Sequence, residues 1–492
     1  MIHPTDAKRA QEDFDHQNRA GSRGHASHTV CCALMAFGAC LPPAYAEYGL
    51  ALGAASFLAG LPRTYRTAWR PFLSPIGLCI LAFVLWSLLS ISWASDKNAA
   101  WNEWGKLRFA FVPFILWPSI DRRMTILAAT LVGIACAQLA QLVHAAGVAL
   151  NIPALTYPLA GNRVGWAIDE LGAGDPDRNG GWWHPLIAGS MFLAACAIHL
   201  SAAMLSDVRD RALSGLRAHW PALAASGAAL LAGVSVVATG SRGAILALSA
   251  TILALFVARF ALRRRGNRRT TLIVLAVTLV LGGGSLVTMG DRLARRFELA
   301  RADVSRAIEE KNFTTDNGAR LLMAWWAIEA VGERPVTGVG VGSYEAWTRA
   351  HVTRQGIDPA SRRFFQHAHN ALLHIAATTG LVGASLVLTL LAGSITFGVR
   401  IGLNATRQSR ATAPARTVGA SSTADSNALA LLAHAYRFSP PAALASLAFV
   451  SVFDPVHYNT TTAFVLWLLI GLCPPWLPAR RSTAATLADQ DS

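Results

Sequence analysis

The sequence predicts an all-α polytopic membrane protein with about 12 transmembrane helices and a large polar segment before the tenth of them. Of its 492 residues, 53% are hydrophobic and only 14% are charged, whereas about a quarter of the residues of a soluble protein are charged. Apolar stretches that approach or exceed the ~20 residues of a bilayer-spanning helix recur along the chain. The 15 tryptophans, for example Trp101 and Trp104, are suited to anchoring at membrane–water interfaces.

The hydropathy pattern divides the chain into two groups of spans. The second and fourth spans of the chain are short enough to be half-inserted. The expected spans cover residues 29–46, 47–62, 74–95, 106–119, 124–150, 185–205, 219–238, 242–262, 270–289, 370–402, 430–453 and 460–478. The corresponding domains are a disordered cytoplasmic tail (1–28), a bundle of about nine spans (29–289), a periplasmic helical domain (290–369), a bundle of about three spans (370–478) and a cytoplasmic tail (479–492).

Arginines concentrate in short loops on one side of this arrangement. These loops contain Arg63/Arg66/Arg70, Arg122/Arg123, Arg209/Arg211/Arg217, Arg263 to Arg269, Arg407/Arg410/Arg416 and Arg480/Arg481. With the N-terminus inside the cell, the positive-inside rule places all of them on the cytoplasmic side. The opposite side then receives residues 96–105, 151–184, 239–241, 290–369 and 454–459.

The net charge of +15 does not indicate nucleic-acid binding, because much of it lies in these loops, where it sets orientation. All seven cysteines lie in apolar segments and are expected to be small core residues. Ala44-Tyr45-Ala46 is similar to a signal-peptidase site. The long polar leader and the apolar span that follows favour an uncleaved first helix.

The segment 290–369 contains two expected helices. In the first, Leu293, Phe297, Ala300, Val304 and Ile308 recur at helical spacing, which predicts an amphipathic helix on the membrane or on the bundle. The second should run from Arg320 to Glu333 and end at Arg334-Pro335. The glycines at 338, 340 and 342 predict a tight turn. They lack the Gly-Lys-Ser/Thr ending of a nucleotide-binding P-loop.

Three arginines are candidate anion ligands on the outward side. Arg242 begins a span in Thr-Gly-Ser-Arg-Gly, where its charge opposes the helix dipole and an incoming anion would relieve that opposition. Its alternative is a snorkelling side chain. Arg320 opens a tryptophan-rich helix and could instead pair locally with Asp316. Arg163 lies in the 151–184 loop, where Arg178 competes for the same role.

Histidines give the second functional signal. His367 and His369 immediately precede the tenth span, and Asn370 is a plausible N-cap that would fix them at the membrane surface. An imidazole is the natural general base at neutral pH. Asp454 lies with His457 in a hairpin on the same side, where it either orients a catalytic histidine or caps the loop. A metal site formed by these groups and His374 is disfavoured, because His-x-His-x4-His does not share one helical face.

Three motifs give the chain its resemblance to a known family. They are Ser241-Arg242-Gly243, the Arg320 helix that ends in Arg334-Pro335-Val336-Thr337-Gly338-Val339-Gly340, and His369-Asn370 leading into Thr379-Gly380-Leu381-Val382-Gly383. With the number of spans and the motif order, they make most of the chain similar to the O-antigen ligase and polymerase family of bacterial inner-membrane glycosyltransferases.

The resemblance implies an enzyme that moves O-antigen from undecaprenyl pyrophosphate to a sugar hydroxyl of the lipid A core at the periplasmic face, with no metal, nucleotide or other cofactor. It implies that Arg242 and Arg320 bind pyrophosphate, that His369 is catalytic and that Asp454 is a functional acid. Arg163 and His367 are further candidates for the pyrophosphate site. The alternatives are an O-antigen polymerase that uses the same carrier and, in a different class, a flippase or transporter of lipid-linked glycans. A transporter should show inverted repeats and charges at mid-membrane.

Overall fold

The computed structural model of the protein describes residues 22–65, 68–152, 179–181, 183–205, 220–262, 290–291, 294–295, 297–358, 364–411 and 435–473. These residues form helices, turns and loops and include no strand. The longer helices are α2 (Ser22–Gly38), α3 (Pro43–Thr64), α4 (Pro75–Ser90), α5 (Lys97–Gly105), α7 (Arg123–Ala149), α10 (Pro185–Leu205), α11 (Trp220–Ala238), α12 (Arg242–Leu262), α14 (Asp316–Glu333), α15 (Tyr344–Arg354), α16 (Ala371–Ala411), α18 (Ser439–Val450) and α19 (Thr460–Leu472).

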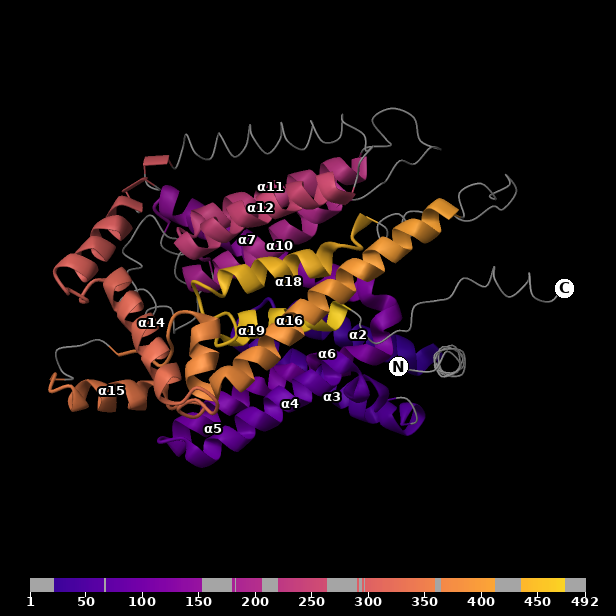
Figure 1. Cartoon of the computed structure of the whole chain (residues 1–492). Helices are drawn as coiled ribbons and strands as arrows, with labels where there is room; N and C mark the ends of the chain where they lie inside the picture. The colour runs from indigo at the N-terminus through magenta and orange to yellow at the C-terminus, as the bar shows by residue number, and fades with distance from the viewer. Residues whose placement is uncertain are drawn as a thin grey trace, which may run out of the picture.

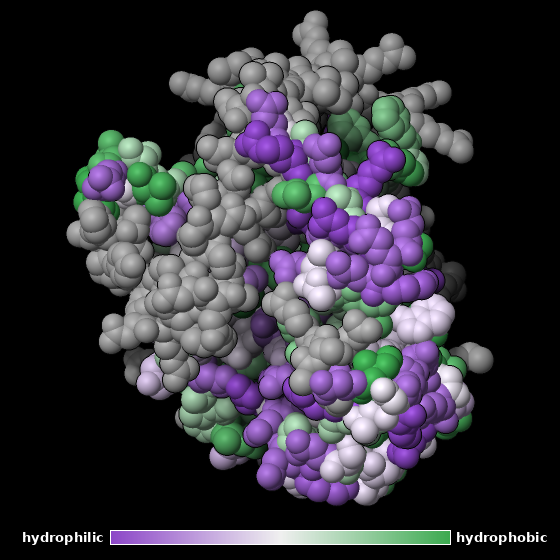
Figure 2. Space-filling view, turned by 90° about the vertical axis from the view of Figure 1, so that its left-hand side faces the viewer, coloured by the Kyte–Doolittle hydropathy of each residue, from purple (hydrophilic) through white to green (hydrophobic). Residues whose placement is uncertain are grey.

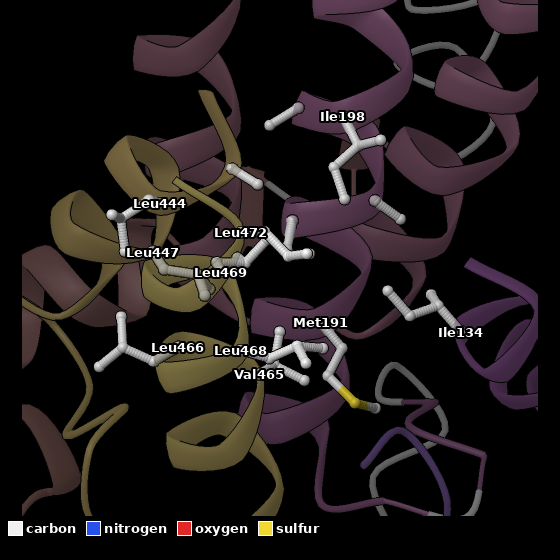
Figure 3. Close-up of a cluster of buried hydrophobic side chains, with 14 of the residues drawn as sticks. Ile134, Met191, Ile198, Leu444, Leu447, Val465, Leu466, Leu468, Leu469 and Leu472 are labelled. Carbon is white, nitrogen blue, oxygen red and sulfur yellow. The ribbon is translucent and has the colours of Figure 1, made fainter. Parts of the chain in front are cut away.

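The core of the bundle is built around α10, which packs against α11, α12 and α18 (Figure 1). Nearly all of α10 is buried, and its many alanine, glycine and serine residues let neighbouring helices approach closely. Figure 3 shows Met191 of α10 beside Val465 and Leu468 of α19, and the same cluster of buried side chains includes Leu444 and Leu447 of α18. The helix is therefore held by neighbours on several sides.

The described residues confirm an all-α protein with several membrane helices. Five helical stretches in this part of the chain are long and apolar enough to cross a bilayer, and the shorter apolar helices are Ala222–Ala238, Ser439–Val450 and Thr460–Leu472. The five stretches are Pro75–Trp93, Lys97–Ala149, Pro185–Leu205, Arg242–Ala261 and Ala371–Asn404. The expected total of twelve is not reproduced there, and the expected span 270–289 lies outside the described residues.

Two expected boundaries near the N-terminus differ from the structure. The first two spans divide at Pro42-Pro43 rather than at residue 46, since proline cannot continue a helix that precedes it. Helix α2 also begins at Ser22, inside the segment expected to be disordered. His28 on this helix is buried, with hydrogen-bond contacts to Ser56 Oγ and the Ile115 carbonyl, each at 2.9 Å.

The expected span 106–119 is irregular. It consists of the 3-10 helices η3 (Lys106–Phe111) and η4 (Trp117–Arg122) on either side of α6 (Val112–Leu116). Pro113 and Pro118 lie in this stretch, and each removes a backbone donor that a continuous α-helix would use. The segment still packs inside the bundle, where Phe109 stacks on Phe464 of α19 with ring centroids 5.0 Å apart.

Helix α16 is kinked at Gly380, and the glycine-rich turn docks on that kink. Gly380 has φ 71° and ψ −177°, and a Cβ at this position would lie 2.0 Å from the Val336 carbonyl oxygen. Val339 N donates to Ala377 O at 2.8 Å, and Leu381 N donates to Pro335 O at 2.7 Å. The turn predicted at residues 338–342 is confirmed, since all three of its glycines have positive φ.

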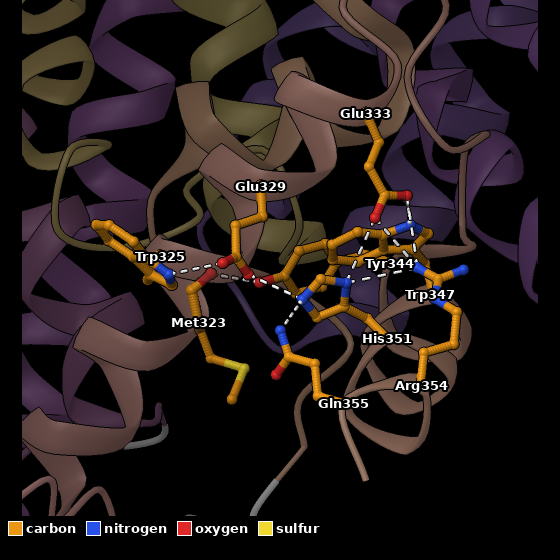
Figure 4. A network of polar contacts seen from close by, with 9 residues as sticks. All are labelled: Met323, Trp325, Glu329, Glu333, Tyr344, Trp347, His351, Arg354 and Gln355. Atoms are coloured by element: carbon orange, nitrogen blue, oxygen red, sulfur yellow. Dashed lines mark hydrogen bonds and ion pairs between the residues drawn. The ribbon is translucent and has the colours of Figure 1, made fainter. Parts of the chain in front are cut away.

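Helices α14 and α15 lie together at one end of the bundle, and α16 runs from that end toward the other (Figure 1). Hydrophilic residues cover much of this end face (Figure 2). The imidazole of His351 on α15 lies 3.0 Å from Glu329 Oε2 and 3.4 Å from Glu333 Oε1 on α14 (Figure 4). Trp347 Nε1 donates to the same Glu333 at 3.0 Å. These contacts clamp α15 to α14.

Both helices expected in the 290–369 segment are present. Helix α14 ends at Glu333 as predicted but begins one turn before Arg320, where Thr315 Oγ1 accepts from Gly318 N at 3.1 Å as an N-cap. Residues 297–309 are helical. Their expected apolar face remains open to the surroundings, since Phe297 is 38% exposed and Ile308 is 57% exposed.

Candidate active site

A single cavity of about 860 Å³ joins three of the residues that the sequence singled out: Arg242, Arg320 and His369. It lies between the start of α12, the helix 297–309, α14, the turn before α16 and the residues after α18. Its other lining residues are Leu186, Gly240, Gly243, Leu246, Arg295, Leu299, Asp303, Val304, Thr315, Asp316, Asn317, Leu321, Ala324, Ala368, Asn370, Val452 and Phe453.

Arg242 is the first residue of α12 and is half-buried at the cavity wall. The turn before it is held by the Thr239 hydroxyl, which accepts from Ser241 N at 3.2 Å. A Cβ on Gly243 would lie 2.6 Å from Phe453 Cβ and 3.2 Å from Asp454 Oδ2. The glycine after the arginine therefore admits a close neighbour, and that neighbour is the loop that carries Asp454.

Arg320 forms an ion pair with Asp454. The distance from Nη1 to Oδ1 is 3.6 Å, and the carboxylate side chain is 6% exposed while that of the arginine is 36% exposed. The pair connects α14 to the loop after α18 across the cavity. Asp454 thus holds a cationic group at the site. Because the arginine is more open than its partner, its guanidinium can also face a bound anion.

His369 occupies a turn immediately before α16. Asn370 Oδ1 accepts from Leu373 N at 2.9 Å, so the predicted N-cap is confirmed. Both ring nitrogens of His369 are buried and have no hydrogen-bond partner within the described residues. Burial, reinforced by the charge of Arg320 and by His374, lowers the pKa of His369 to about 3. The imidazole is therefore neutral at physiological pH.

His367 is not among the residues that line the cavity. Its ring packs between His369, with centroids 4.4 Å apart, and Tyr458, with centroids 4.9 Å apart. Burial is the main cause that lowers the pKa of His367 to about 2. Tyr458 donates its hydroxyl to Gln366 Oε1 at 2.8 Å and carries Lys106 Nζ 3.2 Å from its ring centroid. His367 therefore lies behind the cavity in a packed polar layer.

A second polar cluster extends this layer into the bundle. His374 Nε2 lies 3.0 Å from Glu103 Oε1, and the His374 ring is 5.7 Å from that of His457. Burial lowers the pKa of His457 to about 3, and His374 adds to the effect. A cavity of only about 30 Å³ lies beside Glu103, Lys106 and His457, which is room for about one water. His457 thus belongs to a closed cluster rather than to the large cavity.

The described residues contain no group of three or more histidine, cysteine or acidic side chains placed to hold a metal ion. Arg163 and its competitor Arg178 lie outside the described residues.

Arg295 is a cavity residue that sequence reasoning missed. It lies near the start of the amphipathic helix and is exposed. The helical periodicity of the nearby residues indicated only an apolar face. The arginine itself, in a segment expected on the outward side, could have been recognised as a further candidate anion ligand. Asn317 Nδ2 donates to Asp303 Oδ2 at 2.8 Å, so the same helix is tied to α14 at the cavity wall.

The fold and this cavity define a helical membrane protein that holds arginines and a neutral histidine together at one end of its bundle. A family model described as O-antigen ligase matches residues 227–388, a range that includes Arg242, Arg320 and His369. The chain thus carries a domain of the O-antigen ligase family, which confirms the resemblance seen in its motifs and indicates an enzyme of the ligase or polymerase type. The comparison with curated proteins gave no match.

Proposed function

We propose that the protein is an O-antigen ligase: a glycosyltransferase that moves a polysaccharide from undecaprenyl pyrophosphate to a sugar hydroxyl of the lipid A core, at the periplasmic face of the bacterial inner membrane. The observation that carries this proposal is the meeting of Arg242, Arg320 and the His369 imidazole in one cavity. Two cationic groups and one neutral base are what the transfer of a sugar from a pyrophosphate requires.

The cavity suits an amphiphilic donor. Its arginines can hold the two phosphates by charge-assisted hydrogen bonds, which contribute about 1.5–3 kcal/mol each. Its wall also includes apolar side chains from several elements, among them Leu186, Leu246 and Leu299. These residues can contact the first isoprene units of a polyprenyl tail while the diphosphate lies against the guanidinium groups. The large volume leaves room for sugars of both substrates.

The chemical step is a single displacement. The acceptor hydroxyl gives its proton to a ring nitrogen of His369 as its oxygen forms a bond to the anomeric carbon of the donor. The bond between that carbon and the pyrophosphate oxygen breaks, and its electron pair leaves with the pyrophosphate. Arg242 and Arg320 stabilise the negative charge that develops there. Attack opposite to the leaving group inverts the anomeric centre, and His369 then releases its proton to solvent.

The test is transfer by purified protein with a polyprenyl-pyrophosphate glycan, rough lipopolysaccharide and a chelator. We expect glycan attached to the lipid A core, and a loss of about 10²–10⁴-fold in kcat for His369→Ala. His25→Ala is the matched control, since His25 is a partly exposed histidine of α2 whose ring lies 3.2 Å from Asp121.

Other outcomes identify the alternatives. Glycan extended on the polyprenyl carrier, with the lipid A core unmodified, would indicate a polymerase. Absence of covalent transfer together with movement of the lipid-linked glycan across the membrane would indicate a flippase. Normal transfer by a well-folded His369→Ala protein would remove the general base from the mechanism.

A further inference from the structure

The backbone of His369 has an unusual conformation. Its φ is 54°, in the left-handed region that residues with a Cβ rarely adopt. Such conformations persist only where the surrounding structure fixes them, and they are frequent at functional sites. The turn places His369 at the cavity wall while Asn370 caps α16. Contacts from the surrounding structure must therefore fix the backbone of His369 in this conformation.

One side-chain contact to this turn comes from His367. The backbone N–H of His369 donates to His367 Nδ1 at 3.4 Å. The two rings also meet edge to face at 73°, and the Phe365 ring lies near the His369 ring at a centroid distance of 4.9 Å. This hydrogen bond joins the side chain of His367 to the main chain of His369. It ends on the backbone amide of the residue that has the left-handed φ.

The bond requires one protonation state of His367. Nδ1 can accept only when it carries a lone pair, so the ring must be neutral with its proton on Nε2. The surroundings favour the neutral ring, because it is packed against Tyr458, and Lys106 lies over the same tyrosine. The lowered pKa of His367 agrees with this arrangement.

We propose that His367 is a positioning residue, whose Nδ1 fixes the left-handed turn that aims His369 at the acceptor hydroxyl. This inference rests on the proposed function, because it assumes that His369 is the base. It differs from the substrate-binding role that the sequence suggested for His367. Loss of a residue that binds the pyrophosphate should raise KM for the donor, whereas loss of a positioning residue should lower kcat.

Replacement by asparagine and glutamine separates these roles. Asparagine can place its Oδ1 where His367 Nδ1 lies, whereas glutamine reaches toward the Nε2 position and leaves the His369 N–H without its acceptor. We expect His367→Asn to keep kcat within about 3-fold, and His367→Gln and His367→Ala to lose roughly 100-fold in kcat through misplacement of the base. We expect KM for the donor to stay unchanged in all three variants.

The experiment measures kcat, KM and thermal unfolding for these variants beside wild type and His369→Ala. Equal kcat for the asparagine and glutamine variants would overturn the positioning role, as would an asparagine variant that fails to fold while the glutamine variant folds. A raised KM with normal kcat would instead support binding of the substrate by His367. Full activity of His369→Ala would overturn the proposed function itself, whatever the His367 variants do.

Discussion

His369 and His374 lie on either side of the start of α16 and have opposite surroundings. His374 has a fully buried side chain and lies 3.0 Å from the carboxylate of Glu103. His369 borders a cavity of about 860 Å³, and its ring nitrogens have no hydrogen-bond partner within the described residues. The same side chain therefore has two different environments in one short segment. His374 has a partner within the fold, whereas His369 is the histidine that we propose acts on a substrate.

The charged residues around the two cavities also differ in the space that they border. Glu103 and Lys106 lie around a cavity that holds about one water, so their charges are used within the protein. Arg242 and Arg320 border a space large enough for a diphosphate and sugars. Variants of the large cavity should therefore affect activity more than stability, and variants of the closed cluster should do the reverse.

The largest effect is expected when both arginines are replaced. Arg242→Ala and Arg320→Ala should each remove about 1.5–3 kcal/mol of transition-state stabilisation, so the double variant should lose roughly 10²–10⁴-fold in kcat/KM. The measurement is glycan transfer to lipopolysaccharide by purified protein.

The ion pair of Arg320 with Asp454 requires a control. Arg320→Ala also leaves the buried carboxylate of Asp454 without this cation, which should lower stability. Adding Asp454→Asn in the same protein should recover stability while activity stays low. If activity also returned, the arginine would serve only to balance Asp454, and the diphosphate clamp would be wrong.

A smaller effect, on stability, is expected in the closed cluster formed by Glu103, Lys106, His374 and His457. His374→Ala removes the partner of Glu103 and should reduce the free energy of unfolding by about 3 kcal/mol. His374→Gln can place an amide nitrogen near the Nε2 position and should retain most of the stability. Thermal unfolding in detergent measures both, with His369→Ala as the comparison. If His369→Ala destabilised the protein as much as His374→Ala, the division between the two histidines would fail.

Hydropathy located the regular helices well. The expected spans 185–205 and 242–262 coincide with α10 and α12, because each is one continuous apolar run bounded by polar residues. The same reasoning was wrong where prolines interrupt an apolar run, at Pro42-Pro43 and in the segment 106–122. There the side chains favour burial but the backbone cannot continue an α-helix.

The site could be predicted where a polar residue interrupts an apolar pattern. Arg242 at a span boundary and His369 before an N-cap are such residues, and both line the cavity. The pair of Glu103 with His374 could not be predicted, because the two groups are far apart in sequence and the fold brings them together by packing both α5 and α16 against α4. The exclusion of His367 from the cavity depends in the same way on Tyr458 and Lys106.

The smallest expected effect is a shift in pH dependence, which tests the electrostatic side of the comparison. His369 must be neutral to accept a proton, and its pKa in the free enzyme is lowered to about 3 by burial, by Arg320 and by His374. The kcat/KM of the wild type should therefore not fall through protonation of His369 between neutral pH and about pH 4. A bound diphosphate raises the pKa of His369, so the acid limb of kcat should lie at higher pH than that of kcat/KM.

Variants of Arg320 separate the effect of its charge on the pKa of His369 from the effect of burial. Arg320→Gln removes a positive charge and should raise the pKa of His369, which moves the acid limb of kcat/KM toward neutral pH, while Arg320→Lys keeps the charge and should leave the limb near its original position. The two variants are compared by transfer rates from acidic to neutral pH. An acid limb that is the same in both would mean that burial and His374, without Arg320, set the pKa of His369. The guanidinium of Arg320 would then be too far from the imidazole to act with it on one diphosphate.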